Sequence, residues 1–217
     1  MLTIIQVGND KASTTYVRNK MKAVTAAGME AKHIALPETA TTEDVICKIH
    51  QACESTAIIV QLPLPSHIDK QEVLKRIPPW KDIDGLAPHS PYKPLTPCAI
   101  MRWLKEQGVQ LEGKNVTILG RSELVGKPLA NMMIDAGATV TVCNSKSNVI
   151  LKDCYCFESD IVISATGVAD AVDACMVRPF GRQIFIDVGI NRDENGKLCG
   201  DVDFEAVEPI AGAITPV

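Results

Sequence analysis

The sequence has few of the features that mark membrane, secreted or nucleic-acid-binding proteins. None of its apolar stretches approaches the roughly 18 residues of a membrane-spanning helix. The apolar start MLTIIQVGND is too short for a signal peptide and lacks the basic residues and cleavage site of one. The formal net charge is −4, and lysine and arginine form no stripe that could displace counterions from phosphates. We therefore expect a cytoplasmic protein with neither a membrane nor a nucleic-acid partner.

Metal-binding patterns are also missing. The four histidines are dispersed, and the eight cysteines lack the clustered spacing of a zinc site. Most cysteines lie inside apolar or helical runs, which favours reduced core thiols over disulfides. Cys154 and Cys156, the only close pair, do not have the spacing of a redox motif. We expect no metal site.

The first half of the chain alternates strands and helices. The order is βαβαβ, which is typical of a parallel sheet covered by helices. The predicted elements are a strand at 2–7, a helix at 12–28 that closes at Gly28, a strand at 30–36, a helix at 41–55 capped by Thr42, and a strand at 57–62.

A second alternation follows a proline-rich segment. Residues 77–97 contain six prolines, so we place a junction there between a domain at 1–95 and a domain at 96–217. The predicted elements of the second domain are helices at 98–108 and 126–137, strands at 115–120, 139–145, 160–167 and 183–190, two short segments between the later strands, and a hairpin at 191–202. This organisation predicts two α/β domains, the second of them Rossmann-like, with a ligand cleft between them.

The stretch ILGRSELVGKPLA, residues 118–130, predicts a phosphate-binding turn. A strand ends at Gly120, Arg121 and Ser122 follow in a tight turn, and Gly126 opens a helix whose N–H groups could face a pyrophosphate. The glycine spacing is not the common G-x-G-x-x-G, so the signal depends on the strand that precedes it. An alternative is that Ser122 only caps the helix and Arg121 only contacts solvent.

The end of the next strand indicates which dinucleotide is bound. NAD-binding folds usually place an acid there to hold the ribose 2′-hydroxyl. Asn144 and Ser145 occupy that place, with Lys146 beside them and Arg121 available from the preceding turn. This arrangement suits a 2′-phosphate and favours NADP, with NAD possible.

Two polar groups mark a site in the first domain. Tyr16 and Lys20 are four residues apart on one predicted helix and so share a face. In AIIVQLPLPSH, residues 57–67, Gln61 follows a buried strand and precedes a rigid exit held by Pro63 and Pro65. The carboxyl ends of parallel strands are where α/β folds bind ligands.

Six motifs together resemble one family, the bifunctional methylenetetrahydrofolate dehydrogenase/cyclohydrolases. They are YVRNKMKA (16–23), VQLPLP (60–65), KDIDG (81–85), GRSELVGKP (120–128), GDVDF (200–204) and ITPV (214–217). The resemblance implies oxidation of 5,10-methylenetetrahydrofolate to the methenyl form with NADP, then hydrolysis to 10-formyltetrahydrofolate. It also implies a part in one-carbon metabolism and purine biosynthesis. A homodimer is expected as well, because a second subunit would cover apolar surface that is otherwise exposed.

The resemblance assigns roles to individual residues. Lys20, Gln61 and Asp84 become the catalytic group, while Tyr16, Asp84, Gln61 and Pro63 bind the folate. Asp84 takes the motif position that grips the amino-pyrimidine edge, while Asp82 could instead form the turn; sequence alone separates the two aspartates poorly. The expected cofactor-binding residues are Gly120, Arg121, Ser122, Val125, Gly126, Asn144, Ser145, Gly167 and Ile190.

Two alternative functions stay open at this point. Relatives extend further at both ends, which allows a catalytically impaired remnant that binds folate and NADP without turnover. A shikimate-dehydrogenase-like oxidoreductase would also have two α/β domains and a Lys–Asp pair. The VQLPLP strand exit counts against the latter, because nothing in its chemistry requires that exit.

Overall fold

The computed structural model describes residues 1–179 and 181–216, so Val217, the last residue of the ITPV motif and of the predicted second domain, lies outside the described residues. The chain divides into two compact α/β units, Met1–Lys93 and Pro94–Val217. The division lies within the proline-rich segment and directly before α4 (Leu95–Glu106). No helix in the described part of the chain is long and apolar enough to cross a membrane.

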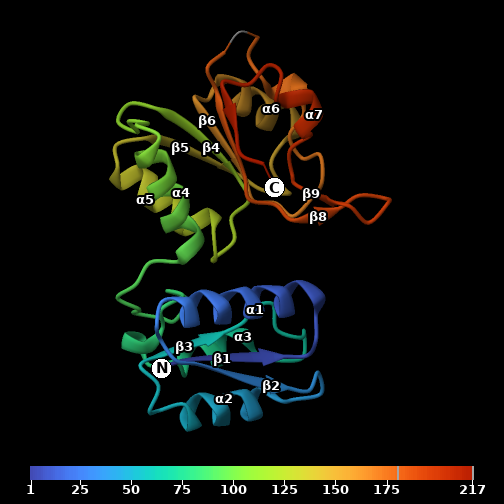
Figure 1. Cartoon of the computed structure of the whole chain (residues 1–217). Helices are drawn as coiled ribbons and strands as arrows, with labels where there is room; N and C mark the ends of the chain where they lie inside the picture. The colour runs from blue at the N-terminus through green and yellow to red at the C-terminus, as the bar shows by residue number, and fades with distance from the viewer. Residues whose placement is uncertain (180, 217) are drawn as a thin grey trace. The chain divides into compact units, whose positions relative to one another are not determined.

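The first unit is a three-stranded parallel sheet with helices on both faces (Figure 1). Its strands have the order β2 (Ala31–Leu36), β1 (Leu2–Val7), β3 (Ala57–Val60). Helix α1 (Lys11–Ala26) covers one face, and α2 (Thr42–Gln51) and α3 (Lys70–Lys75) cover the other. The order 2-1-3 places the reversal of strand order between β1 and β3, where the carboxyl ends of open α/β sheets bind ligands.

The central strand β1 explains why the first unit needs both layers of helices. All six of its residues are buried. Ile5 and Val7 pack in the core formed with α2 and α3, whereas Leu2 and Ile4 pack with Val17 of α1. Because successive side chains of a strand point to opposite faces, a strand that is buried along its whole length, as this one is, needs cover on both sides.

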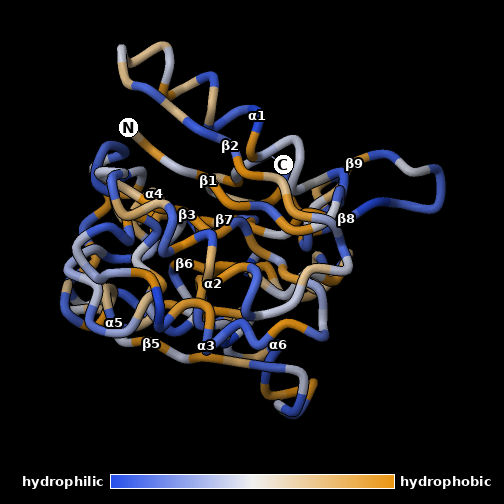
Figure 2. Tube along the Cα trace, turned by 90° about the horizontal axis from the view of Figure 1, so that it is seen from below, coloured by the Kyte–Doolittle hydropathy of each residue, from blue (hydrophilic) through white to orange (hydrophobic). Residues whose placement is uncertain are grey.

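The second unit is a doubly wound sheet of five parallel strands. Its order is β10 (Ala213–Ile214), β7 (Ile184–Asp187), β6 (Ile161–Ser164), β4 (Asn115–Leu119), β5 (Thr139–Cys143). Helices α4 and α5 (Gly126–Asp135) pack on one face, while α6 (Val149–Glu158) and α7 (Phe204–Val207) pack on the other. The hairpin β8 (Asn191–Arg192) and β9 (Leu198–Cys199) ends in a hydrophilic tip, in contrast to the apolar sheet strands (Figure 2). The strand order reverses between β4 and β6.

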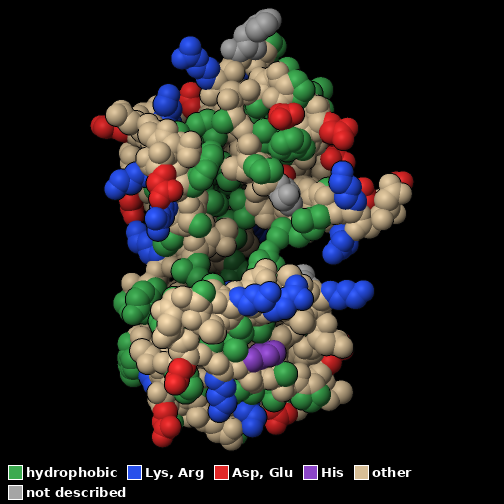
Figure 3. Space-filling view, viewed as in Figure 1, with side chains coloured by type: hydrophobic (Ala, Val, Ile, Leu, Met, Phe, Trp, Pro, Cys, Tyr) green, Lys and Arg blue, Asp and Glu red, His purple; other side chains and the backbone are tan. Residues whose placement is uncertain are grey.

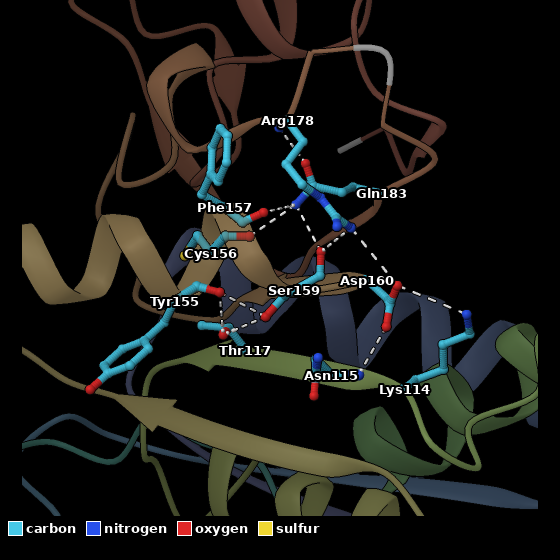
Figure 4. A network of polar contacts seen from close by, with 10 residues as sticks. All are labelled: Lys114, Asn115, Thr117, Tyr155, Cys156, Phe157, Ser159, Asp160, Arg178 and Gln183. Atoms are coloured by element: carbon cyan, nitrogen blue, oxygen red, sulfur yellow. Dashed lines mark hydrogen bonds and ion pairs between the residues drawn. The ribbon is translucent and has the colours of Figure 1, made fainter.

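A polar network attaches the end of α6 to the sheet (Figure 4). The fully buried Gln183 donates from Nε2 to the carbonyl oxygens of Cys156 and Ser159, both at 2.9 Å, and accepts from the Arg178 amide at 2.6 Å. The hydroxyls of Thr117 and Ser159 lie 2.7 Å apart. These bonds satisfy carbonyl groups at the helix end that no longer have an intrahelical partner. The network therefore holds α6 in a defined position on the sheet.

The structure corrects three local expectations. Thr41, not Thr42, caps α2: its hydroxyl accepts from the Asp44 amide, and the Asp44 carboxylate accepts from the Thr41 amide. Residues 149–158 form the full helix α6, which Asn148 caps, rather than a short segment. The sequence did not indicate this helix because the apolar residues of its first turn are exposed and do not follow a helical period of burial. The short elements α3, α7 and β10 also escaped prediction.

Few of the cysteines are in the core. Cys143 and Cys156 are buried. Four others are exposed, namely Cys47, Cys53, Cys154 and Cys175. Apolar neighbours in sequence therefore did not indicate burial, because on amphipathic helices they alternate with residues that face water.

Candidate functional site

The first candidate site brings together three residues that are distant in sequence. The ammonium Nζ of Lys20, on α1, lies 3.3 Å from Oε1 of Gln61 and 3.5 Å from Oδ2 of Asp84. Gln61 follows β3, and Asp84 lies in the turn after the short 3₁₀ helix Pro79–Lys81. One cation therefore faces an amide oxygen and a carboxylate at the switch point of the first sheet.

The surroundings of Gln61 explain its place at the strand exit. Its amide N–H continues the parallel ladder by donating to Ile5 O at 2.8 Å, and its side chain is 8% exposed. Nε2 donates to the Leu62 carbonyl at 2.7 Å, just before the cis peptide bond to Pro63. With its amide nitrogen held in this way, Gln61 directs Oε1 toward Lys20.

The two aspartates of KDIDG have different environments. Asp82 is buried, and its carboxylate accepts from the Ala87 amide at 2.7 Å, so it organises the turn. Asp84 faces Lys20 instead. Burial raises the pKa of Asp84, and the nearby Lys20 charge and hydrogen bond partly oppose that rise. The geometry thus gives Asp82 the turn and leaves Asp84 for contact with a ligand.

Two predicted folate-binding residues lie on the surface of the first unit. Tyr16 is one helical turn before Lys20, and its side chain is 45% exposed. Pro63, two residues after Gln61, is exposed. Among the described residues, none forms a hydrogen bond with the Tyr16 hydroxyl.

The second candidate site is a cavity of about 470 Å³ in the second unit. Residues at the carboxyl ends of β4, β5 and β6 line it together with Lys152; they are Leu119, Gly120, Arg121, Ser122, Cys143, Asn144, Ser145, Ala165, Thr166, Val168 and Ala171. This is the position at which the strand order of the second sheet reverses. The volume falls in the range of small-molecule and cofactor pockets.

Glycine is required at two points beside this cavity. Gly120 has φ of 109°, and a Cβ there would overlap the carbonyl oxygen of Ala165. A Cβ at Gly126 would overlap the carbonyl oxygen of Gly120. Between them, the Ser122 hydroxyl accepts from the Val125 amide at 3.1 Å and shapes the turn into α5. The close approach of turn, strand and helix is the one that dinucleotide-binding folds need for a pyrophosphate.

The cavity contains five of the nine predicted cofactor residues: Gly120, Arg121, Ser122, Asn144 and Ser145. Val125 and Gly126 support the turn without lining the cavity. Gly167 adjoins two lining residues, Thr166 and Val168, whereas Ile190 is 51% exposed and does not line the cavity. Ser122 does more than cap a helix, since it both shapes the turn and borders the cavity.

Sequence reasoning missed residues that shape this site. Lys152 and Thr166 line the cavity, and Asp201 of the GDVDF motif lies fully buried behind it. Asp201 Oδ2 accepts from the Thr166 amide at 2.6 Å, from the Thr166 hydroxyl at 2.8 Å and from the Gly167 amide at 3.2 Å. The sequence showed the motif, but the partners Ser164, Thr166 and Gly167 of Asp201 are 34 to 37 residues away, so only the fold reveals these contacts.

The charge of Asp201 is stabilised by these donors. Burial by itself would raise the pKa of Asp201, but hydrogen bonds from Thr166, Asn191 and Ser164 outweigh burial and lower it. Oδ1 accepts from Asn191 Nδ2 at 2.9 Å, which connects the loop after β6 to the hairpin strand β8. Asp201 therefore holds one wall of the cavity in position.

Replacing Gly126 by Ala should disrupt the phosphate-binding turn. The new methyl group overlaps a backbone oxygen that cannot rotate away, so we expect a loss of about 1–3 kcal/mol of stability and weakened dinucleotide binding. Denaturant unfolding and cofactor titration would measure both effects. Gly28→Ala is the control: no atom lies within 4 Å of its new Cβ, but its φ of 74° strains an alanine, so this variant should lose stability without weakened dinucleotide binding. An equal loss of dinucleotide binding in the two variants would contradict the close-packing argument.

The fold and the second site together define a two-domain NAD(P)-dependent oxidoreductase with a Rossmann-like domain. Two family models match the chain: "Tetrahydrofolate dehydrogenase/cyclohydrolase, catalytic domain" over residues 1–84 and "Tetrahydrofolate dehydrogenase/cyclohydrolase, NAD(P)-binding domain" over residues 94–217. The chain belongs to the tetrahydrofolate dehydrogenase/cyclohydrolase family, which confirms the resemblance of its motifs.

Individual relatives agree with this assignment. The bifunctional protein FolD of Streptococcus pneumoniae serotype 2 is 46% identical over 228 residues, which cover 100% of this chain and 79% of the relative. The crystal structure of FolD from Campylobacter jejuni is 39% identical with a TM-score of 0.92, covering 100% of this chain and 80% of that one. The Trypanosoma brucei enzyme, solved with NADP and an inhibitor, is 35% identical with a TM-score of 0.92. The similarity covers 100% of this chain and 79% of that one.

The shikimate-dehydrogenase alternative does not hold. A shikimate dehydrogenase from Thermus thermophilus is 16% identical to this chain with a TM-score of 0.54, covering 86% of this chain and 78% of that one. That similarity shows a shared fold alone. The family match over both units decides between the two possibilities.

Proposed function

We propose that the protein oxidises 5,10-methylenetetrahydrofolate to 5,10-methenyltetrahydrofolate with NADP and then hydrolyses the product to 10-formyltetrahydrofolate. The observation that carries the proposal is the Lys20 ammonium held between Gln61 and Asp84 at the end of the first sheet. The family assignment and the glycine-lined cavity of the second unit support it.

In the oxidation, the protein mainly binds and orients. Asp84 can accept two N–H bonds from the amino-pyrimidine edge of the folate, and the Tyr16 ring offers a surface for stacking. Loss of hydride from the methylene carbon is assisted by the lone pairs of the folate's own N5 and N10, so positioning is the main requirement. The chemistry that bound NADP supplies is the acceptance of two electrons with that hydrogen.

The hydrolysis requires management of protons. Water adds to the methenyl carbon, the bond from that carbon to N5 breaks, and one proton is released. Lys20 is the group positioned to hold or pass a proton at Nζ, and Gln61 Oε1 orients Lys20 or the attacking water. Asp84 lies close enough to stabilise the cation while it also binds the substrate.

The residues of the second unit fit NADP. Gly120 and Gly126 keep the turn open for close backbone approach, and the cavity has Arg121, Asn144 and Ser145 at the end of β5 and the preceding turn. Of the described residues that line the cavity, none is an aspartate or glutamate. A lining without carboxylates suits a ribose that carries a 2′-phosphate.

Charge on the first unit favours an anionic substrate. Helix α1 carries Lys11, Arg18, Lys20 and Lys22 and no acidic residue. Lys and Arg side chains gather along this helix in Figure 3. Tetrahydrofolate bears the carboxylates of its glutamyl tail, so the field of α1 would promote encounter with it.

The decisive experiment mixes the protein with 5,10-methylenetetrahydrofolate and NADP or NAD in parallel. Reduced nicotinamide and methenyl absorbance are followed separately. We expect reduced nicotinamide to form faster with NADP, without accumulation of the methenyl form beyond its spontaneous decay. Ligand binding with no absorbance change would instead identify a catalytically inactive remnant, and no binding of either ligand would contradict the proposal.

We also propose that the protein acts in the cytoplasm as a homodimer and contributes formyl groups for purine biosynthesis. The exposed free thiols of Cys47, Cys53, Cys154 and Cys175 suit a reducing compartment. On α6, Val149, Ile150 and Leu151 are 66%, 73% and 50% exposed, which supports a second copy as cover for this surface. Light scattering after size exclusion tests the dimer: Ile150→Asp should reduce its fraction, and a monomeric wild-type protein would contradict it.

A further inference from the structure

One cation of the cofactor cavity has no role in any of the motifs. Lys152 lies in the first turn of α6 and borders the cavity beside the segments that follow β5 and β6. Its three predecessors in the helix, all apolar, are at least half exposed, whereas the Lys152 side chain is only 24% exposed. In the first turn of α6 the apolar side chains are therefore exposed to solvent, while the charged Lys152 side chain faces the cavity.

The inward position of Lys152 is held by specific contacts. Nζ donates to the carbonyl oxygen of Ala171 at 3.3 Å and lies 3.6 Å from Oδ1 of Asp153. Ala171 also lines the cavity, whereas Asp153 does not. An ammonium has three donors, so the contact with Ala171 leaves Lys152 able to bind an anion in the cavity. The polar network at the other end of α6 fixes the helix that carries it.

The position of Lys152 in the cavity indicates which part of a bound dinucleotide it would contact. The pyrophosphate position is defined by the turn 120–126, which offers backbone N–H groups at the start of α5. Lys152 instead follows the end of β5, near Asn144 and Ser145, where dinucleotide folds hold the adenosine ribose. Lys146, which is closer to this strand end in sequence, is exposed and does not line the cavity.

We propose that Lys152 is a specificity-determining residue that binds the 2′-phosphate of NADP together with Arg121. This inference rests on the proposed use of NADP. A phosphate monoester carries close to two negative charges near neutral pH, and two cations with no carboxylate among the described lining residues complement it. NAD, with an uncharged 2′-hydroxyl, gains nothing from the second cation.

Calorimetric titration of the intact protein with two adenosine probes tests this role without turnover. Adenosine 2′,5′-bisphosphate has the 2′-phosphate, and adenosine 5′-monophosphate lacks it. In Lys152→Met, affinity for the bisphosphate should fall on the order of tenfold or more, which is the usual effect of losing a charged hydrogen bond. Affinity for the monophosphate should change less than about twofold.

Further variants separate charge from structure. Lys152→Arg should retain most of the preference for the bisphosphate, and Lys105→Met, an exposed lysine of α4, should bind both probes as the wild type does. Lys146→Met should lose less affinity for the bisphosphate than Lys152→Met. The ratio of kcat/KM for NADP to that for NAD should fall in Lys152→Met by the same factor as the bisphosphate affinity.

Three results would overturn the inference. They are equal losses for both probes in Lys152→Met, unchanged bisphosphate binding in that variant, and a larger loss in Lys146→Met. If the wild-type protein binds the monophosphate but shows no preference for the bisphosphate, the inference fails while a dinucleotide site remains. If the wild type binds neither probe, the proposed use of NADP fails as well.

Discussion

Replacement of Lys20 by Met should reduce hydrolysis of 5,10-methenyltetrahydrofolate by about 10²–10⁴-fold, the usual contribution of a positioned acid or base. Methionine keeps the length of the side chain but cannot hold a proton or donate to Gln61 Oε1. Oxidation of methylenetetrahydrofolate should decrease less, because that step depends mainly on positioning. The measurement is the rate of methenyl loss above the spontaneous rate, alongside the rate of NADP reduction.

A second readout distinguishes a local from a general effect in this variant. Lys20 lowers the pKa of Asp84, so its removal should raise that pKa further above its ordinary value. Carboxyl chemical shifts followed against pH would detect the change. Lys22→Met, an exposed lysine on the same helix, is the matched control. Full hydrolysis in Lys20→Met, or an equal loss in Lys22→Met, would refute the role assigned to Lys20.

Replacement of Asp201 by Ala should destabilise the protein by about 3–4 kcal/mol, because several buried donors lose their acceptor together. The groups left without it include the Ser164 hydroxyl at 3.0 Å, the Thr166 amide and hydroxyl, and the Gly167 amide. Since Thr166 lines the cofactor cavity, NADP binding should weaken in parallel. Denaturant unfolding and cofactor titration would measure the two losses.

The loss of stability in Asp201→Ala should also depend on pH. The pKa of Asp201 lies below its ordinary value of 3.8 in the folded state, so the folded state favours the charged form. Its stabilising contribution is therefore fully present above pH 3.8 and is lost as the pH falls through the lower folded pKa. The difference in the free energy of unfolding between wild type and Asp201→Ala should become smaller over that acid range.

Two comparisons make the result specific to this carboxylate. Asp201→Asn keeps the shape and one acceptor oxygen, so its loss of stability should be smaller than that of Asp201→Ala. Asp135→Ala, at an exposed helix end, should change stability by no more than about 0.5 kcal/mol. A loss below 1 kcal/mol in Asp201→Ala would mean that its donors find other partners, against the arrangement described.

The sequence by itself determined the division into two α/β units and the class of each. The apolar run 2–7 and the alternation after it require a parallel sheet covered on both faces, which is the sheet observed. The turn 118–130 predicted Gly120, Arg121 and Ser122 as cofactor residues, and all three line the cavity. These features were accessible because periodicity, glycine requirements and turn chemistry act between residues that are close in the chain.

Only the tertiary structure decided which distant groups meet. The proximity of Lys20 to Gln61 and Asp84 depends on two crossovers of the first sheet, and the separation of roles between Asp82 and Asp84 depends on which carboxylate the Ala87 amide reaches. No local pattern indicates that Asp201 is buried or that Lys152 borders the cavity, because their partners Thr166 and Ala171 come from other segments. Burial and electrostatics depend on the assembled fold, whereas the patterns that predict strands and turns depend on residues that are neighbours in the sequence.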